Sequence, residues 1–193
     1  MLSYKESLKI LKETNALLEG HFVLSSGLHS DKYVQCAQLL SKPSKAKEIC
    51  LSLAEKINEN FKSFDLIVSP AMGGVVIGYE IGRILGKETI FAERVNGKFE
   101  LRRGFKIQKN QKILIVEDVI TTGKSSLECT EMINKHNGNV IGYACIIDRS
   151  NDRSLIKKDF VSQIKIEIPT YNKNELPDHL KKLNPTKPGS RNL

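Results

Sequence analysis

The sequence lacks any long apolar run and any closely spaced pair of cysteines. No stretch approaches the ~18 apolar residues that a membrane span needs, and the charges within Met1–Gly20 interrupt what would be the apolar core of a signal peptide. The four cysteines, at positions 36, 50, 129 and 145, form no C-x-x-C pair, so neither a zinc site nor a disulfide framework is expected. Isolated thiols indicate a reducing, cytoplasmic location. No membrane partner is expected, because no long apolar run is present.

The remaining composition is that of an ordinary globular chain. Its 193 residues, 40% hydrophobic and 27% charged, are typical of one domain with a real core. The formal net charge of +8 suggests a polyanionic partner, but basic residues concentrate only in 94–106 and 181–191. Scattered lysines are typical of solvated helix faces, and a small polyphosphorylated ligand explains the first cluster as well as DNA does. We therefore predict no nucleic-acid partner.

The order of elements indicates an α/β fold. Apolar spacing predicts helices over 4–18 and 43–60, with short strands at 22–24 and 33–34 between them. Strands at 65–69, 89–92, 112–116 and 140–147 then alternate with helices that end near Gly86 and run over 124–136. Continuous apolar strands alternating with helices indicate a parallel sheet covered on both faces. A half-exposed edge strand is expected over 161–168, and a polar tail follows Pro169.

The most informative motif follows the apolar strand Ile113–Val116. Two acids, Glu117 and Asp118, precede a turn rich in hydroxyls, where ligands of open α/β sheets bind. A nucleotide-binding P-loop is rejected because Asp118 stands where that motif needs glycine. Amides and hydroxyls of Thr121–Ser125 at a helix N-terminus suit a phosphate monoester, and the carboxylates suit vicinal ribose hydroxyls. Alternatively, the acids cap the helix and the threonines only form its turn.

Val116–Ser125 resembles the phosphoribosyl-pyrophosphate (PRPP) loop of type I phosphoribosyltransferases. The resemblance implies a type I phosphoribosyltransferase-like parallel sheet flanked by helices, with a small hood formed by the N-terminal segment and the C-terminal tail. It implies one domain over 1–193, with a hood segment at 1–40, a core at 61–150 and a tail at 169–193. The PRPP-binding residues it implies in this loop are Glu117, Asp118, Val119, Ile120, Thr121, Thr122, Gly123, Lys124 and Ser125.

Other segments are similar to orotate phosphoribosyltransferases in particular. His21–Ser30 is similar to their base-binding segment, and the implied orotate-binding residues are Ser26, Gly27, Thr121 and Arg149. Phe91–Phe105 resembles their mobile catalytic loop and adds Arg94 and Lys98 to the PRPP site, with Val95 and Glu100 near the places where many members carry lysine and histidine. The segment that resembles their pyrophosphate loop is Ala71, Met72, Gly73 and Gly74. A plain strand-to-helix turn, a solvated hairpin and a surface ion pair of Arg149 are the competing interpretations.

The resemblance implies transfer of the phosphoribosyl group of PRPP to orotate, giving orotidine 5′-monophosphate and pyrophosphate in pyrimidine (UMP) synthesis. Lys98, Asp118 and Glu117 are the implied catalytic residues. Mg²⁺ is expected to arrive with the substrate, without direct ligation by the protein. A homodimer that shares the mobile loop between subunits is also implied. The alternatives are a purine or uracil phosphoribosyltransferase and a non-catalytic protein that senses PRPP.

Overall fold

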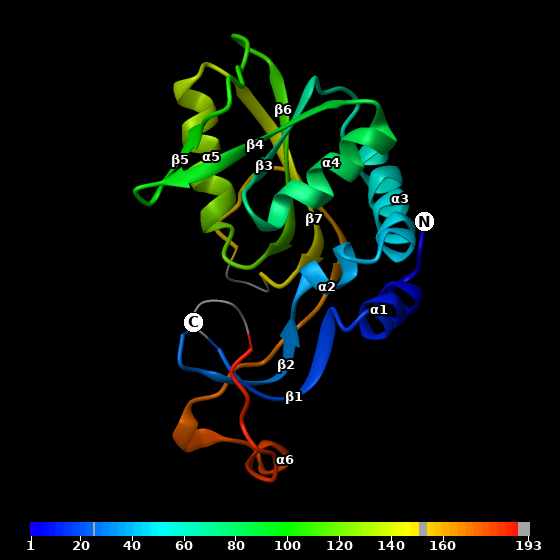
Figure 1. The fold of residues 1–193 in the computed structure, drawn as a ribbon, viewed down its shortest axis with the longest axis vertical. Coiled ribbons are helices and arrows are strands. Elements are labelled where there is room, and N and C mark those ends of the chain that lie inside the picture. The colour runs from blue at the N-terminus through cyan, green and yellow to red at the C-terminus, as the bar shows by residue number, and fades with distance from the viewer. Residues whose placement is uncertain (25, 151–153, 189–193) are drawn as a thin grey trace.

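A six-stranded sheet in the order β5-β4-β3-β6-β7-β8 forms the centre of the fold (Figure 1). The computed structural model describes residues 1–24, 26–150 and 154–188. The strands are β3 (Leu66–Pro70), β4 (Glu88–Val95), β5 (Lys98–Leu101), β6 (Lys112–Ile120), β7 (Asn139–Asp148) and β8 (Phe160–Lys165). All neighbours pair in parallel except β4 and β5, which form an antiparallel hairpin. The predicted parallel sheet is confirmed.

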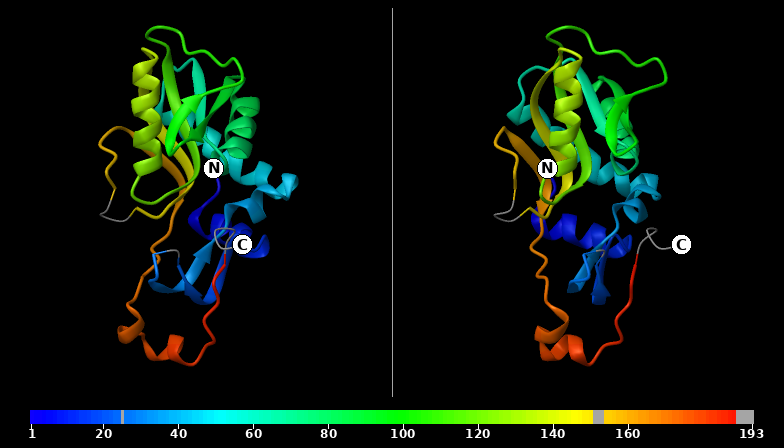
Figure 2. Two further views of the ribbon diagram at one scale, coloured as in Figure 1. Left: turned by 60° about the vertical axis from the view of Figure 1, so that its left-hand side comes forward. Right: turned by 90° about the vertical axis from the view of Figure 1, so that its left-hand side faces the viewer.

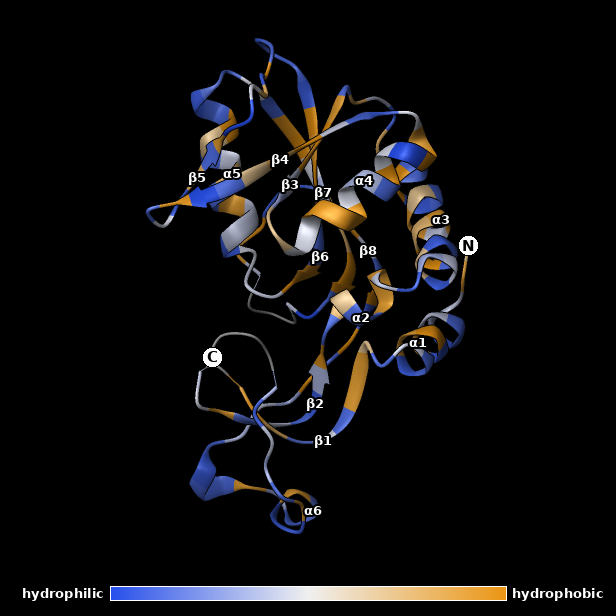
Figure 3. Ribbon diagram, viewed as in Figure 1, coloured by the Kyte–Doolittle hydropathy of each residue, from blue (hydrophilic) through white to orange (hydrophobic). Residues whose placement is uncertain are grey.

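Helices cover both faces of this sheet, as the apolar strands predict. On one side α3 (Pro43–Asn60) and α4 (Gly73–Leu85) pack on alternate residues of the strands, such as Leu114 and Val116. On the other side α5 (Lys124–Lys135) packs on Ile113 and Ile115. Figure 3 shows hydrophobic residues concentrated in the strands of the sheet. A strand buried on both faces has no polar side to alternate with, which explains the continuous apolar run before the acids.

A smaller layer, the hood, joins the two ends of the chain. It consists of the antiparallel strands β1 (Leu17–Val23) and β2 (His29–Val34), and of the tail that follows β8 with a 3-10 turn η2 (Lys173–Glu175) and α6 (Asp178–Lys181). Isolated bridges pair Phe22 with Thr186 and His29 with Tyr171. Both views in Figure 2 show the hairpin and the tail below the sheet, with α1 (Tyr4–Glu13) and α2 (Cys36–Leu40) between.

Two buried histidines fasten the hairpin to the tail. His21 Nε2 and His29 Nδ1 are 2.6 Å apart, and His21 Nδ1 lies 3.0 Å from the Leu183 carbonyl oxygen. Because a carbonyl can only accept, His21 must carry its proton on Nδ1 and accept at Nε2 from His29 when both rings are neutral. This chain of hydrogen bonds joins residues 162 positions apart in the sequence.

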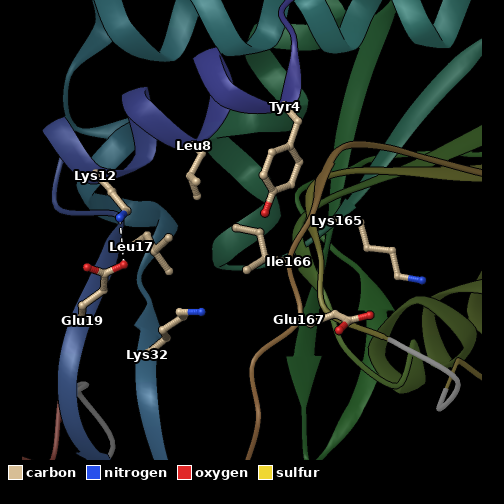
Figure 4. A pocket seen from close by; sticks show the side chains of 9 residues that line it. All are labelled: Tyr4, Leu8, Lys12, Leu17, Glu19, Lys32, Lys165, Ile166 and Glu167. Carbon is tan, nitrogen blue, oxygen red and sulfur yellow. Dashed lines mark ion pairs between the residues drawn. The ribbon is translucent and has the colours of Figure 1, made fainter.

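A cleft of about 400 Å³ lies at the junction of the hood and the sheet (Figure 4). Its floor is apolar, with Leu17 and Ile166, while the side chains of Tyr4 and Lys32 point into it. The ion pair between Lys12 and Glu19, 2.8 Å long, closes one side. None of the residues that the sequence assigns to the PRPP or orotate sites lines this cleft.

Several predicted elements are wrong at their ends. The strands predicted at 22–24 and 33–34 start earlier, as β1 at Leu17 and β2 at His29. The helix predicted over 4–18 stops at Glu13, because Asn15 adopts a left-handed φ of 58° and Leu17 starts β1. The edge strand predicted over 161–168 is confirmed as β8 but ends at Lys165, since its partner β7 ends at Asp148. None of the helices in the described ranges combines the length and the apolar character that a membrane crossing requires.

Candidate active site

The carboxyl ends of β3, β6 and β7 meet at one edge of the sheet because these strands run parallel. Each end leads directly into predicted site residues: Ala71 after β3, Thr121 after β6 and Arg149 after β7. The backbone N–H of Arg149 donates to the Ile120 carbonyl at 2.8 Å, which joins two of these ends. Ligands of open α/β sheets bind at this edge, so the fold brings most of the predicted residues to one place.

The two acids belong to strand β6 itself rather than to the turn after it. The strand continues through Glu117 and Asp118 to Ile120, which pairs with Asp148 of β7. Successive side chains of a strand point to opposite faces, and the contacts follow this rule. Ser126 of α5 donates a hydrogen bond to Glu117 Oε1, whereas the Asp118 carboxylate lies against Gly73 at the start of α4. The acids therefore enter different helical layers.

Glu117 is buried and Asp118 is half-buried. Glu117 is 8% exposed, and burial raises its pKa to about 7 against the opposing effect of the Ser126 hydrogen bond. Burial also raises the pKa of Asp118, although the Val119 backbone N–H donates to its Oδ1 at 2.9 Å. Burying an acid costs free energy unless a partner compensates for it. Acids with raised pKa values at a sheet edge indicate a site for a ligand that supplies hydroxyls or a cation.

The predicted phosphate turn runs from the end of β6 into α5. Thr121 and Thr122 are exposed, and Gly123 has a left-handed φ of 77° with α5 starting at the next residue. A Cβ on Gly123 would come within 2.7 Å of the Ile156 side chain, so this close approach requires glycine. The amides of a first helical turn have no partner within the helix and favour anions. The turn therefore has the backbone that a phosphate monoester needs.

The predicted pyrophosphate loop is shorter than a free loop. Only Ala71 and Met72 separate β3 from α4, and Gly73 and Gly74 are already helical. A Cβ on Gly73 would lie 2.6 Å from Asp118 Oδ1, and a Cβ on Gly74 would lie 3.0 Å from the Val116 carbonyl oxygen. Both glycines are needed to bring the N-terminus of α4 against β6. The segment therefore has the geometry of the competing interpretation, a strand-to-helix turn, and its role as a pyrophosphate loop stays a prediction.

The segment that resembles a catalytic loop forms the β4–β5 hairpin, whose turn has φ values of 50° at Asn96 and 82° at Gly97. Arg94 donates from Nη1 to the Gly97 carbonyl at 2.8 Å and stacks on the Phe99 ring, 4.1 Å from its centre. Lys98 is exposed at the tip. This hairpin confirms the turn that Asn-Gly predicts.

A second set of contacts braces the base of the same hairpin. Arg103 donates to both carboxylate oxygens of Glu93, at 2.9 and 3.1 Å, and lies over the Phe91 ring. Phe91 in turn meets Phe105 edge to face, with ring centres 5.2 Å apart. These contacts tie the turn that follows β5 back to β4.

The predicted base site is only partly assembled at this edge. Arg149 is half-buried beside the end of β6, and Thr121 lies at the start of the phosphate turn. Ser26 and Gly27 instead occupy the turn of the β1–β2 hairpin in the hood, where the Gly27 N–H donates to Leu24 O at 2.9 Å. Ser25, in the segment similar to the base-binding one, lies outside the described residues. The residues predicted for the base site thus lie in two layers.

Two residues that the sequence analysis did not select hold this site. Ser126 hydrogen-bonds the buried Glu117, and Glu128 pairs with Arg94 of the hairpin. Glu128 also stands four residues after Lys124 on α5, with 3.9 Å between Oε1 and Nζ. The i,i+4 spacing of opposite charges is visible in the sequence and could have identified Glu128. Nothing in the sequence marks Ser126 from its neighbour Ser125.

Replacing Glu117 by Gln should change how stability depends on pH. An acid whose pKa is raised from 4.5 to about 7 on folding stabilises the fold fully below pH 4.5, and this contribution is lost as pH rises to about 7. Between pH 5 and 8 the wild-type free energy of unfolding should therefore fall by about 2–3 kcal/mol relative to Glu117→Gln. Urea unfolding measures it, with the exposed Glu131→Gln on α5 as control. If the free energies of unfolding of wild type and Glu117→Gln changed with pH in parallel, the raised pKa of Glu117 would be contradicted.

Comparison with known proteins agrees with this geometry. The phosphoribosyl transferase domain family matches residues 35–182. The orotate phosphoribosyltransferase of Erythrobacter litoralis is 44% identical over 188 residues, which cover 97% of each chain. Leishmania donovani UMP synthase has a TM-score of 0.73 at 19% identity over 86% of this chain, which spans only 37% of that longer protein. Orotate phosphoribosyltransferase from Aeropyrum pernix has a TM-score of 0.68 at 24% identity, over 82% of this chain and 93% of that one. The structural likenesses show the fold, and the sequence match shows that this chain belongs to the phosphoribosyl transferase family and, within it, to the orotate phosphoribosyltransferases.

Proposed function

We propose that this chain transfers the phosphoribosyl group of PRPP to orotate in de novo synthesis of UMP. The proposal rests on the β6–α5 connection, where the buried Glu117 and the half-buried Asp118 precede the turn over Thr121–Ser125, whose amides and hydroxyls at a helix N-terminus suit a phosphate. The 44% identical relative that bears the name of this activity supports the choice of base. The four cysteines are buried and free, which supports a reducing compartment such as the cytoplasm.

In this reaction N1 of orotate forms a bond to ribose C1 while the bond from C1 to the pyrophosphate oxygen breaks. The products are orotidine 5′-monophosphate and pyrophosphate. Positive charge develops on the sugar and negative charge on the leaving group, so positioning and electrostatics dominate over proton transfer. Glu117 and Asp118 accept hydrogen bonds from the ribose hydroxyls, and the turn from Thr121 to Ser125 binds the 5′-phosphate. The amides beside Gly73 and Gly74 face the pyrophosphate.

The acid pair also fits a magnesium ion that arrives with PRPP. Oxygen ligands suit Mg²⁺, and two carboxylates whose pKa values are raised gain from a nearby cation. Within the described ranges no group of three or more acids, histidines and cysteines could hold a metal ion by itself. The ion would therefore be ligated by the substrate, and the nearby carboxylates of Glu117 and Asp118 would favour it electrostatically without ligating it. When bound, Mg²⁺ neutralises charge on the leaving pyrophosphate.

Cationic side chains of the hairpin serve the leaving group, and Lys98 is the residue we assign to it. Arg103 is committed to Glu93, whereas Lys98 and Arg102 are exposed. Orotate is a planar anion with paired acceptors, for which the fork-shaped guanidinium of Arg149 and the hydroxyl of Thr121 are suitable partners. Ser26 and Gly27 approach the base from the hood.

We propose a homodimer on the basis of an apolar stripe along α4. Met72, Val76 and Tyr79 are 82%, 52% and 68% exposed, and their spacing puts them on one side of the helix. Beside them lies a groove of about 410 Å³ whose lining includes Leu40 and Pro43. The stripe starts at the pyrophosphate segment, so a second copy of the chain that covers it would border the active site. This supports sharing of the β4–β5 hairpin between subunits.

The proposed function is tested by adding PRPP and Mg²⁺ to the protein and orotate. Loss of orotate absorbance with equal release of pyrophosphate is expected. Adenine, hypoxanthine and uracil assayed in the same way should give no pyrophosphate. Transfer to one of these bases instead would reassign the substrate, and PRPP binding with no turnover of any base would indicate a sensor rather than an enzyme.

Lys98→Ala should lower kcat more than it raises the KM for PRPP. The ammonium group stabilises negative charge that develops only as the pyrophosphate leaves. Its removal should therefore lower kcat by roughly 100-fold. Steady-state kinetics with both substrates measure the split. Lys109→Ala, another exposed lysine after the hairpin, is the matched control. A raised KM with an unchanged kcat would remove Lys98 from the chemical step.

Subunit sharing is tested by mixing two inactive variants, Lys98→Ala and Arg149→Ala. If the hairpin acts in the partner's site, a mixed dimer contains one site in which both residues are intact. Random pairing should then restore roughly a quarter of the wild-type activity. Each variant alone, unfolded and refolded in the same way, provides the baseline. Activity that stays at this baseline, while mass measurements show mixed dimers, would mean that each subunit works with its own hairpin.

A further inference from the structure

We propose that Ser126 is a positioning residue for the reaction. Its hydroxyl fixes one oxygen of the Glu117 carboxylate and keeps this acid ionised near neutral pH, so that the other oxygen can accept a hydrogen bond from the ribose. The inference rests on the proposed function, which assigns Glu117 to the ribose, and deepens it. Ser126 follows the turn assigned to the 5′-phosphate and acts through Glu117 rather than on the substrate.

The hydrogen bond between Ser126 and Glu117 lies in the packed interface between α5 and the sheet. Ser126 is fully buried in the first turn of α5, and its hydroxyl donates to Glu117 Oε1. Among the described residues no other group hydrogen-bonds this carboxylate, and Oε2 is not fully enclosed. Ser126 therefore holds one side of the acid and leaves the other side for a ligand.

The backbone of Ser126 is itself tied to the sheet. Its carbonyl oxygen accepts a hydrogen bond from the Thr130 hydroxyl at 2.9 Å, one turn further along α5. The same hydroxyl lies 2.8 Å from the phenol oxygen of Tyr143 on β7. These contacts fix the start of α5 against the sheet, so the Ser126 hydroxyl has a defined position from which to hold the carboxylate.

The ionisation of Glu117 depends on the groups that face it. Burial has the largest effect and raises its pKa to about 7. The hydrogen bond from Ser126 has the largest effect in the other direction. The charge of Asp118, its neighbour on β6, raises the pKa further, and the charge of Arg94 on β4 lowers it. Ser126 is therefore the group that most opposes the effect of burial.

Two buried thiols also lie near Glu117. Cys145 is opposite it in the β6–β7 ladder, and Cys129 belongs to α5. Burial raises the pKa of both thiols, and the charge of Glu117 raises them further. Both thiols therefore stay protonated and neutral in the range in which Glu117 titrates, and they add no charge beside it.

Protonation of Glu117 would remove the property that the ribose needs. An ionised carboxylate is purely an acceptor, whereas a protonated one carries an O–H donor and accepts less. An acid with a pKa of about 7 is protonated in a large share of molecules at neutral pH. A hydrogen bond donated to the charged form favours that form. Without Ser126 most of Glu117 would be protonated at neutral pH.

A purely structural role for Ser126 predicts a different result. The hydroxyl would then only satisfy a buried acid and hold α5 on the sheet. Its loss would lower stability and activity by the same factor at every pH. The pH dependence of activity therefore distinguishes the two roles.

Ser126→Ala should move the acid limb of the pH profile of kcat/KM for PRPP upward by about one pH unit. At pH 7 the variant should be about fivefold less active than wild type, and at pH 9 the two should agree within about twofold, because Glu117 is then ionised in both. The 5′-phosphate of PRPP also titrates, near pH 6, but it does so equally with both proteins.

Two further variants serve as controls for this profile. Ser126→Cys keeps a weak donor of similar size, so its acid limb should lie between those of wild type and Ser126→Ala. Thr130→Val removes a hydroxyl of the same helix that bonds elsewhere, and its acid limb should match wild type. An acid limb of Ser126→Ala at the wild-type position, or an equal displacement in Thr130→Val, would overturn the inference.

Carbon NMR of the free protein separates this inference from the proposed reaction. With glutamate labelled at its carboxyl carbon, the Glu117 signal is the one that disappears in Glu117→Gln. Its titration midpoint should be about 7 in wild type and about one pH unit higher in Ser126→Ala. Equal midpoints would contradict the role of Ser126. A displaced midpoint with an undisplaced kinetic limb would also overturn the inference, because Glu117 would then not act on the sugar.

The NMR result stands whether or not the protein consumes orotate, since no substrate is present. Failure of the orotate assay alone would count only against the proposed function.

Discussion

Glu117 and Asp118 occupy consecutive positions on a central strand whose two faces are both covered by helices, so their side chains have to enter opposite layers. Burial there raises the pKa of both acids. Acids in such a position bring no benefit to the stability of the fold itself. The free-energy cost is acceptable where a substrate or cation compensates for it. The helices on both faces accommodate the two acids, and the residues that do so border the candidate site.

Each layer accommodates one acid in its own way. On the α4 side the residue next to Asp118 is a glycine. A Cβ on Gly73 would lie within 2.6 Å of Asp118, so only glycine lets the helix start against the carboxylate. On the α5 side the Ser126 hydroxyl donates a hydrogen bond to Glu117. Because both helices start at these points, the N-terminal amides of α4 and α5 come to the same edge as the acids. An anion at either helix and a hydroxylated sugar between them then fit the same geometry.

The sequence predicts the parts of this molecule that local chemistry determines. Pro43 at the first position of α3 and the Asn96-Gly97 turn set element ends that the structure confirms. The end of α1 is also local, since Asn15 adopts a left-handed φ of 58° and asparagine is one of the residues that end helices in this way, but the helical spacing of the apolar residues does not reveal it. Features that depend on contacts far along the chain are harder to predict, such as the length of β6, which depends on pairing with β7. The division of the two acids between layers follows from that pairing, because a strand alternates its side chains where a turn does not.

The same distinction applies to the cationic hairpin. Its charges look equivalent in the sequence, and only the folded contacts divide them into groups. Arg103 returns to Glu93 at the base of the hairpin, Arg94 pairs across to Glu128, and Lys98 stays exposed at the tip. Pairing two of the cations stiffens the hairpin and leaves its tip as the part that can respond to a polyphosphate. The acidic partners reduce the repulsion among the basic residues, so a strongly basic segment can fold as an ordered hairpin before any anion binds.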